Sequence, residues 1–199
     1  MFDFLFELSS SKAIAAFIAS AVTIGNFIYY LYTMYKGQTK PHLYTWLVWG
    51  LTALIVALIQ TDNAETQGTW LAYTVAFVAL VRAALAIPYG EKEITKGDSI
   101  SLFMCLGSIV FWVFLDSPLV SVFILTFIDL MAYYPTFRKS WHKPMEEPAI
   151  SHFIFGATNM LSVISLDNFT LVTATYQSAV ALFSYLFVVY VMVRRNRVI

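Results

Sequence analysis

One carboxylate stands inside a long apolar stretch of this chain. Asp129 lies about ten residues into the run 119–137, in the segment TFIDLMAYYPTF. A charged side chain in the middle of an apolar span is costly and in most membrane proteins marks a functional position. In such a role Asp129 would exchange protons and couple them to the movement of a solute. The same carboxyl could instead lock two helices together through hydrogen bonds, and both roles stay open.

The pattern around Asp129 is repeated 103 residues earlier. The segment 126–144 matches 23–41 without gaps at six of 19 positions, and Asn26 takes the place of Asp129. A repeat of this length indicates a duplicated structural unit. Because the shared polar residues recur at helical spacing, each copy is predicted to be a helix with one polar face. We expect Asn26 and Asp129 to face a pathway between the two copies.

The composition places these helices in a membrane. Of 199 residues, 59% are hydrophobic and only 12% are charged, against about 25% charged in a typical soluble domain. The sequence therefore predicts an all-α membrane protein with seven transmembrane helices. The apolar runs that could cross a bilayer are 13–35, 42–60, 69–87, 99–115, 119–137, 149–166 and 171–193.

The repeat divides the seven predicted helices into three, one and three. Because each unit holds an odd number of helices, a single helix between the units lets them run parallel. Two parallel triple-helix bundles joined by a linker helix are an arrangement found in transporters. The predicted parts are a lead at 1–12, a first unit at 13–87, a loop and linker helix at 88–118, a second unit at 119–193 and a basic tail at 194–199.

Lysine and arginine are concentrated on one predicted side of the membrane. Only Lys12 falls on the other side. Since cytoplasmic loops are enriched in these residues, we expect the C-terminus in the cytoplasm and the N-terminus outside, in the plasma membrane. The residues on the basic side are Lys36, Lys40, Lys92, Lys96, Arg138, Lys139, Lys143, Arg194, Arg195 and Arg197.

The plan of three, one and three helices resembles the SWEET and PQ-loop transporter superfamily, including its relatives that take up nicotinamide-riboside-type vitamins. That superfamily has Pro-Gln near the end of the first helix of each unit, followed by a basic residue. Here Pro135 and Thr136 stand in that place in the second unit, and Tyr32 and Thr33 in the first. The resemblance implies that these four residues form the hinge motif. An internal proline is also expected to bend or end its helix.

The resemblance further implies that the third helix of each unit holds the substrate. The candidates there are Gln177 with its counterpart Thr74, and the repeat-related tyrosines Tyr73 and Tyr176. Packing of small and polar residues between helices is the alternative explanation.

The residues themselves add further candidates. Asn159 gives the sixth predicted helix a polar face, and Trp49 lies deep enough to line a cavity. The expected hydrogen-bond partners of Asp129 are Asn26, Asn159 and Gln177. The full set of candidate substrate-binding residues is Asn26, Asp129, Asn159, Gln177, Thr74, Tyr73, Tyr176 and Trp49.

Two further residues are interpreted as features of the membrane boundary. Trp46 belongs with other aromatic residues of a belt at the membrane surface. Arg82 lies six residues before Pro88, and its side chain is expected to extend along the helix to reach that surface.

These features predict a transporter or facilitator for a small polar solute that works by alternating access. The solute class is left open among sugars, nucleosides or vitamins, and amino acids, and transport is either uncoupled or proton-coupled through Asp129. The predicted partners are the solute and the lipid bilayer, with a homo-oligomer left open. A seven-helix sensor and a lipid-handling membrane protein without transport remain alternatives.

The sequence lacks the residues that other classes of function require. A retinal protein needs a lysine inside a span for its Schiff base, and none lies deep in one. His42, His142 and His152 do not have the spacing of a metal site. We therefore expect no catalytic residues, no metal, no cofactor and no nucleic-acid partner.

Overall fold

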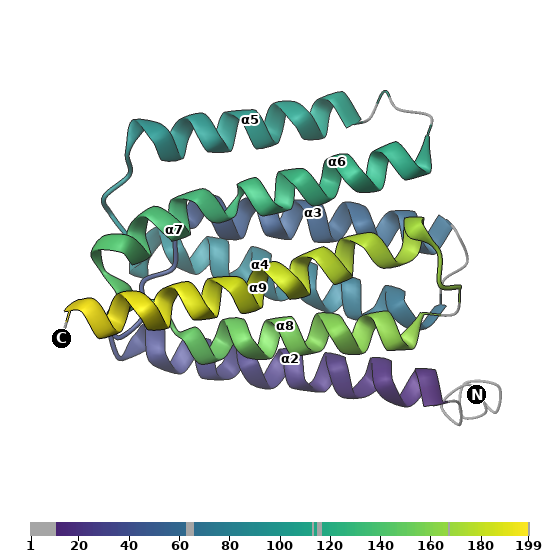
Figure 1. Cartoon of the computed structure of the whole chain (residues 1–199), viewed down its shortest axis with the longest axis horizontal. Coiled ribbons are helices and arrows are strands. Elements are labelled where there is room, and N and C mark those ends of the chain that lie inside the picture. Colours follow the sequence, from purple (N-terminus) through teal and green to yellow (C-terminus); the bar gives the residue numbers. More distant parts are fainter. Residues whose placement is uncertain (1–10, 63–65, 113, 115–116, 167, 199) are drawn as a thin grey trace.

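The computed structural model describes residues 11–62, 66–112, 114, 117–166 and 168–198. All regular structure within these ranges is helical (Figure 1), which confirms the predicted all-α class. Most of the predicted N-terminal lead lies outside the described residues. The elements are α2 (Ser11–Tyr35), α3 (Leu43–Asp62), α4 (Thr66–Tyr89), α5 (Lys96–Trp112), α6 (Pro118–Met131), α7 (Tyr133–His142), the short 3-10 helix η1 (Pro144–Glu146), α8 (Ala149–Ser165) and α9 (Leu171–Val198).

Five of the seven predicted spans have the length and apolar character of membrane-crossing helices. α2, α3, α4, α9 and the continuous path of α6 and α7 are long and apolar enough to cross a bilayer, whereas α5 and α8 have 17 residues each. Counting α6 and α7 together, the described residues form seven helical rods, as predicted. Large apolar side chains face outward, where lipid can cover them, and the protein is thus an integral membrane protein. Among these side chains are Phe17, Phe77, Phe103, Phe127 and Leu182.

The helices pack in a definite order. α4 lies between α2 and α3, and α9 lies between α6 and α8. The two groups meet where α2 packs on α8 and where α3 packs on α6, while α5 lies at the edge of the bundle against α6 and α3 (Figure 1). Glycines allow two of these contacts. A Cβ atom at Gly50 would lie 2.6 Å from Leu80 of α4, and one at Gly156 would lie 2.9 Å from the Tyr185 ring of α9.

α2 ends at a glycine turn. The backbone N–H of Gly37 donates to Met34 O at 2.9 Å, and that of Gln38 donates to Thr33 O at 2.9 Å. These two bonds form a Schellman motif, whose first residue past the helix adopts positive φ. Gly37 has φ of +70°, a conformation that costs glycine little because it lacks a Cβ atom. The chain can therefore leave α2 abruptly and enter the basic loop.

The rod formed by α6 and α7 is interrupted at Ala132. Pro135 has no N–H to donate to the carbonyl of Met131, four residues earlier. That carbonyl instead accepts a hydrogen bond from Ser101 Oγ of α5 at 3.2 Å. The next carbonyl, of Ala132, accepts one from Thr45 Oγ1 of α3 at 2.9 Å. Side chains of two other helices thus satisfy the carbonyls at the interruption.

The topology can be tested with reporter fusions. A reporter fused after Ile199 is expected to be cytoplasmic, and one inserted between Thr61 and Gly68 is expected to be outside the cell, because the basic loops favour the cytoplasmic side. Figure 1 shows the start of α2 and the end of α9 at opposite ends of the bundle. Paired fusions to alkaline phosphatase and a fluorescent protein measure both positions. The reversed pattern would overturn the predicted orientation.

Candidate functional site

Asp129 is buried at the centre of the bundle. Its side chain is 2% exposed. One carboxyl oxygen, Oδ1, accepts hydrogen bonds from Thr52 Oγ1 of α3 at 2.6 Å and from the Tyr176 hydroxyl of α9 at 3.1 Å. Its backbone carbonyl accepts a bond from Trp49 Nε1 at 3.0 Å. Asp129 therefore connects three helices through hydrogen bonds, and an ionised carboxyl needs such donors when it is buried.

Asn26 bonds to a different helix. Its Nδ2 donates to the carbonyl of Ser151 at 3.0 Å, and its Oδ1 accepts from Ser151 Oγ at 2.7 Å. These bonds join α2 to α8. The prediction that Asn26, Asn159 and Gln177 are the partners of Asp129 is wrong, because Thr52 and Tyr176 occupy that role.

A cavity lies between the two groups of helices. Asn26 and Asp129 both line it, although they do not bond to each other. The remaining lining residues are Thr23, Trp46, Trp49, Val75, Val78, Ala79, Arg82, Phe155 and Tyr176. This space is called the central cavity below.

Aromatic rings form much of the wall of the central cavity. Trp46 and Trp49 meet edge to face with ring centroids 5.0 Å apart. Trp49 also stacks on Phe155 of α8, with centroids 6.1 Å apart and planes 24° apart. The wall thus combines rings of α3 with a ring of α8. Such flat apolar surfaces, with a few polar groups among them, are typical of small-molecule sites.

Comparison with known proteins yields no match: no protein-family model, no curated protein and no solved structure matches this chain. Membership of the SWEET and PQ-loop superfamily therefore stays a prediction.

Arg82 is the main residue that the sequence interpretation placed wrongly. Its side chain does not reach the membrane surface but is 3% exposed. The guanidinium carbon lies 4.6 Å from the ring centroid of Tyr30 and 4.5 Å from that of Trp46. These distances indicate cation–π contacts. The signal in the sequence is an arginine inside a predicted apolar span.

The other candidate residues are divided among several places. Tyr176 and Trp49 join Asp129 at the central cavity, as described above. Asn159 and Thr74 donate instead to carbonyls of their own helices, Phe155 O at 2.9 Å and Trp70 O at 2.8 Å. Tyr73 lies 3.2 Å from the Thr61 hydroxyl. These contacts can be made within one helix or one helical hairpin and give no sign of a ligand.

The candidate hinge residues lie near the basic loops. Tyr32 is exposed on the outside of α2. Thr33 Oγ1 donates to Tyr30 O at 2.9 Å. Thr136 Oγ1 donates to Thr45 Oγ1 at 2.9 Å, beside the interruption at Ala132. Only the second of the two candidate hinge sites therefore coincides with an interrupted helix.

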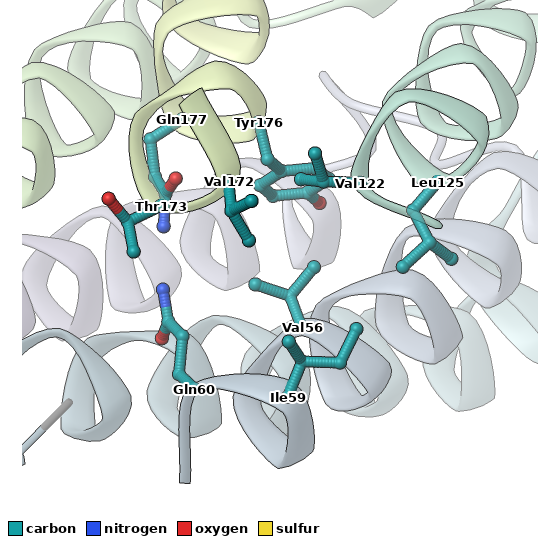
Figure 2. A pocket seen from close by; sticks show the side chains of 9 residues that line it. All are labelled: Val56, Ile59, Gln60, Val122, Leu125, Val172, Thr173, Tyr176 and Gln177. Atoms are coloured by element: carbon teal, nitrogen blue, oxygen red, sulfur yellow. The ribbon is translucent and has the colours of Figure 1, made fainter. Parts of the chain in front are cut away.

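A second cavity lies between α3, α6 and α9 on the side away from the basic loops (Figure 2). Gln60 and Gln177 point toward each other across it, and the side-chain carbonyl oxygen of each is buried without a hydrogen-bond partner. Tyr176 lines this cavity as well as the central one. Tyr176, whose hydroxyl donates to Asp129, thus lies between the two cavities.

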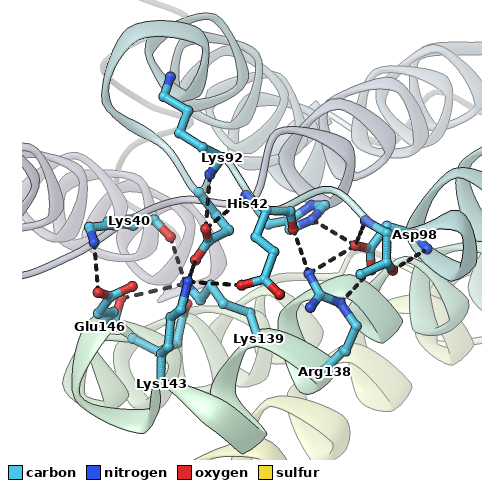
Figure 3. Close-up of polar contacts among 12 residues, drawn as sticks. Lys40, His42, Lys92, Asp98, Arg138, Lys139, Lys143 and Glu146 are labelled. Atoms are coloured by element: carbon cyan, nitrogen blue, oxygen red, sulfur yellow. Dashed lines mark hydrogen bonds and ion pairs between the residues drawn. The ribbon is translucent and has the colours of Figure 1, made fainter.

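Charged residues close the bundle at its basic end (Figure 3). Lys40 pairs with Glu146 at 2.7 Å, and Lys143 pairs with Glu91 at 3.0 Å. Arg138 Nη2 lies 2.9 Å from a carboxyl oxygen of Asp98. The first two pairs connect the loops after α2, α4 and α7, and the third joins α7 to α5. The loops on this side are therefore held to one another through their charges.

Lys139 and Glu147 form a buried ion pair at the same end of the bundle. The Lys139 ammonium donates to the carboxylate of Glu147 and to the carbonyl of Lys40, the latter at 2.6 Å. His152 Nε2 lies 2.8 Å from the other carboxyl oxygen of Glu147. Burial alone would raise the pKa of Glu147, but the charge of Lys139 and the bond with His152 outweigh it and lower this pKa to about 2. Glu147 is therefore ionised at neutral pH.

No metal site accompanies these groups. Within the described ranges, no cluster of three or more histidine, cysteine, aspartate or glutamate side chains has a geometry that could hold a metal ion. His42 lies 3.6 Å from Asp98. Its burial lowers the pKa of His42 to about 4, so its ring is neutral at physiological pH.

Proposed function

We propose that this protein is an integral membrane transporter or facilitator that moves a small polar solute through the central cavity by alternating access. The observation that carries the proposal is the cavity itself. Polar groups of α2, α4 and α6 converge there with aromatic rings of α3 and α8. A purely structural role, in which side chains hold helices together, can explain Asn26 and Asp129, because their hydrogen bonds are satisfied. It does not explain Arg82, because two nitrogens of its side chain lack a hydrogen-bond partner.

The packing supports two parallel triple-helix units with α5 as the linker. In each unit the third helix, α4 or α9, lies between the other two. The first helix of each unit packs on the second helix of the other, α2 on α8 and α6 on α3. The repeat-related residues follow the same scheme, because Asn26 bonds Ser151 of α8 while Asp129 bonds Thr52 of α3. Such a crosswise relation is what a two-fold repeat produces.

The two ends of the cavity differ in a way that supports alternating access. Toward the basic loops, Lys139 and Glu147 form a buried ion pair across the end of the bundle. Away from those loops, the second cavity approaches the central one at Tyr176. We interpret this conformation as closed on the basic side, which the orientation above makes the cytoplasmic side.

Cysteine labelling tests whether water and solutes reach the central cavity. The chain has a single cysteine, Cys105, so Cys105→Ser gives a background without thiols. In that background Val78→Cys, on the cavity wall, is expected to react with a water-soluble, membrane-impermeant thiol reagent. Phe103→Cys is the matched control, because Phe103 is 71% exposed on the lipid-facing side of α5. Its labelling is expected to be several-fold slower, since a thiol in lipid stays protonated.

Solute flux in proteoliposomes provides the second arm of this test. We expect at least one solute from a panel of radiolabelled sugars, nucleosides and amino acids to be taken up. Reaction of Val78→Cys with the thiol reagent is expected to abolish this uptake. If Val78→Cys is labelled no faster than Phe103→Cys and no solute of the panel crosses, the transport proposal fails. A sensor or a lipid-handling protein would then explain the fold better.

A further inference from the structure

The side chain of Arg82 reaches the central cavity with one edge unpaired. Its Nε and Nη2 atoms are buried and have no hydrogen-bond partner. These two nitrogens lie on the same edge of the planar guanidinium group. That edge is the one that binds both oxygens of a carboxylate through two parallel hydrogen bonds.

The protein itself supplies no anion for this edge. Among the described residues, the nearest candidates are already engaged: Asp129 accepts bonds from Thr52 and Tyr176, and Glu147 is paired with Lys139. The Tyr30 and Trp46 rings contact the guanidinium group but accept no hydrogen bond along its edge. A buried cation without an anionic partner is unfavourable. Arg82 is therefore best explained by a partner that arrives from outside the chain.

The surroundings of Arg82 limit the size and character of that partner. Side chains of α2, α3, α4, α6, α8 and α9 surround the central cavity, so its occupant is a small molecule that fits between these helices rather than a peptide or a lipid. Trp46, Trp49 and Phe155 line the cavity together with Arg82 and form an apolar wall for the body of such a molecule. Bidentate geometry favours a planar carboxylate over a spherical ion such as chloride.

We propose that Arg82 binds the carboxylate of a small organic acid whose apolar or aromatic body lies against Trp46 and Trp49. This inference rests on the proposed function and names the solute class: a monocarboxylate, with an amino acid included. Binding occurs within the central cavity, so the acid is the transported solute. Asp129 lies in the same cavity, where a free amino group on the solute would find an acceptor.

Matched acid and amide pairs test this inference directly. The probes are phenylacetate with phenylacetamide, nicotinate with nicotinamide and phenylalanine with phenylalanine amide, each titrated by calorimetry against the purified protein in detergent. At least one acid is expected to bind in the millimolar range or better, at least tenfold tighter than its amide, because the amide leaves Arg82 without an anion. Chloride and phosphate are titrated as inorganic anions.

Variants of Arg82 separate binding from folding. Arg82→Gln is expected to abolish acid binding, and Arg82→Lys is expected to weaken it at least tenfold, since an ammonium group keeps the charge but not the two-pronged geometry. Arg197→Gln, at an exposed position of α9, is the matched control and should bind the acid normally. Labelling the arginine side chains with nitrogen-15 adds a readout on the folded wild type: the Arg82 Nε–H proton resonance should shift on addition of the acid and not on addition of the amide.

The outcomes distinguish this inference from the transport proposal. If each amide binds as tightly as its acid, if no acid binds at millimolar concentration, or if Arg82→Gln binds the acid unchanged, the assignment of Arg82 is overturned. Equal effects of chloride, phosphate and carboxylates would reduce Arg82 to a general anion site and also overturn it. Flux of a neutral sugar or nucleoside would persist in each of these cases if the protein is a transporter of another class.

Discussion

The substitution Glu147→Gln is expected to lower the free energy of unfolding by about 3–5 kcal/mol, the usual cost of removing one partner of a buried ion pair. Glu147 is 2% exposed and accepts bonds from Lys139 and His152. The glutamine keeps the shape of the side chain but leaves the ammonium of Lys139 buried without an anion. Unfolding in a graded series of denaturing detergent, followed by circular dichroism, measures the change.

The neighbouring residue provides a matched control. Glu146 pairs with Lys40, whose side chain is 42% exposed, and solvent-exposed pairs contribute no more than about 1 kcal/mol. Glu146→Gln is therefore expected to be nearly neutral. The double variant Lys139→Met with Glu147→Gln should recover part of the lost stability, because it removes the buried charge. Equal effects of Glu146→Gln and Glu147→Gln on the free energy of unfolding would show that the buried pair contributes no more to stability than the exposed pair.

The same ion pair gives a pH dependence of a definite sign. The pKa of Glu147 falls from 4.5 to about 2 in the folded protein. A carboxyl with a lowered folded-state pKa contributes stability that is fully present above pH 4.5 and is lost as the pH falls toward 2. The wild type should therefore lose thermal stability across this range, and Glu147→Gln should lose much less. Parallel melting curves of the two proteins at stepped pH values measure the difference.

Asp129→Asn is expected to fold normally and to abolish the pH dependence of solute uptake. The amide keeps an oxygen that can accept from Thr52 and Tyr176, but it cannot exchange a proton. Asp129→Ala removes the acceptor as well and leaves the Tyr176 hydroxyl buried without a partner, at a cost of about 1–3 kcal/mol. Uptake by proteoliposomes at stepped pH, together with melting temperatures, separates the two effects.

Asn26 serves as the control for this pair of variants. Asn26→Ala breaks the bonds to Ser151 and should lower stability, yet it should leave the pH dependence of uptake in place because the residue does not titrate. If Asp129→Asn retains full pH-dependent uptake, Asp129 is only a lock between helices. The protein would then be better described as an uncoupled facilitator.

The sequence predicted the helices well because their signals lie within single segments. The apolar runs gave the number of rods, and Pro135 indicated where one of them would be interrupted. The repeat drew attention to Asn26 and Asp129 before their neighbours were known. Each of these signals depends on the spacing of residues along one helix, which the helical period fixes.

The contacts between helices could not be predicted in the same way. Helical spacing shows which residues share a face but not which residues of another helix meet that face. Thr52 and Tyr176 reach Asp129 from α3 and α9, and neither was predicted as its partner. Arg82 was misplaced for a related reason, because only the packed structure shows that Tyr30 and Trp46 lie close enough to its guanidinium group to hold it inside the bundle.

The interruption at Ala132 makes the two walls of the central cavity unequal in stiffness. α2 runs as one helix from Ser11 to Tyr35, so it resists bending along its whole length. On the other side of the cavity, Asp129 belongs to α6. The helix path is interrupted beyond it at Ala132, where Ser101 and Thr45 hold the neighbouring carbonyls. We therefore expect a bend of the bundle to occur at Ala132 rather than within α2, and α5, which carries Ser101, to move with it.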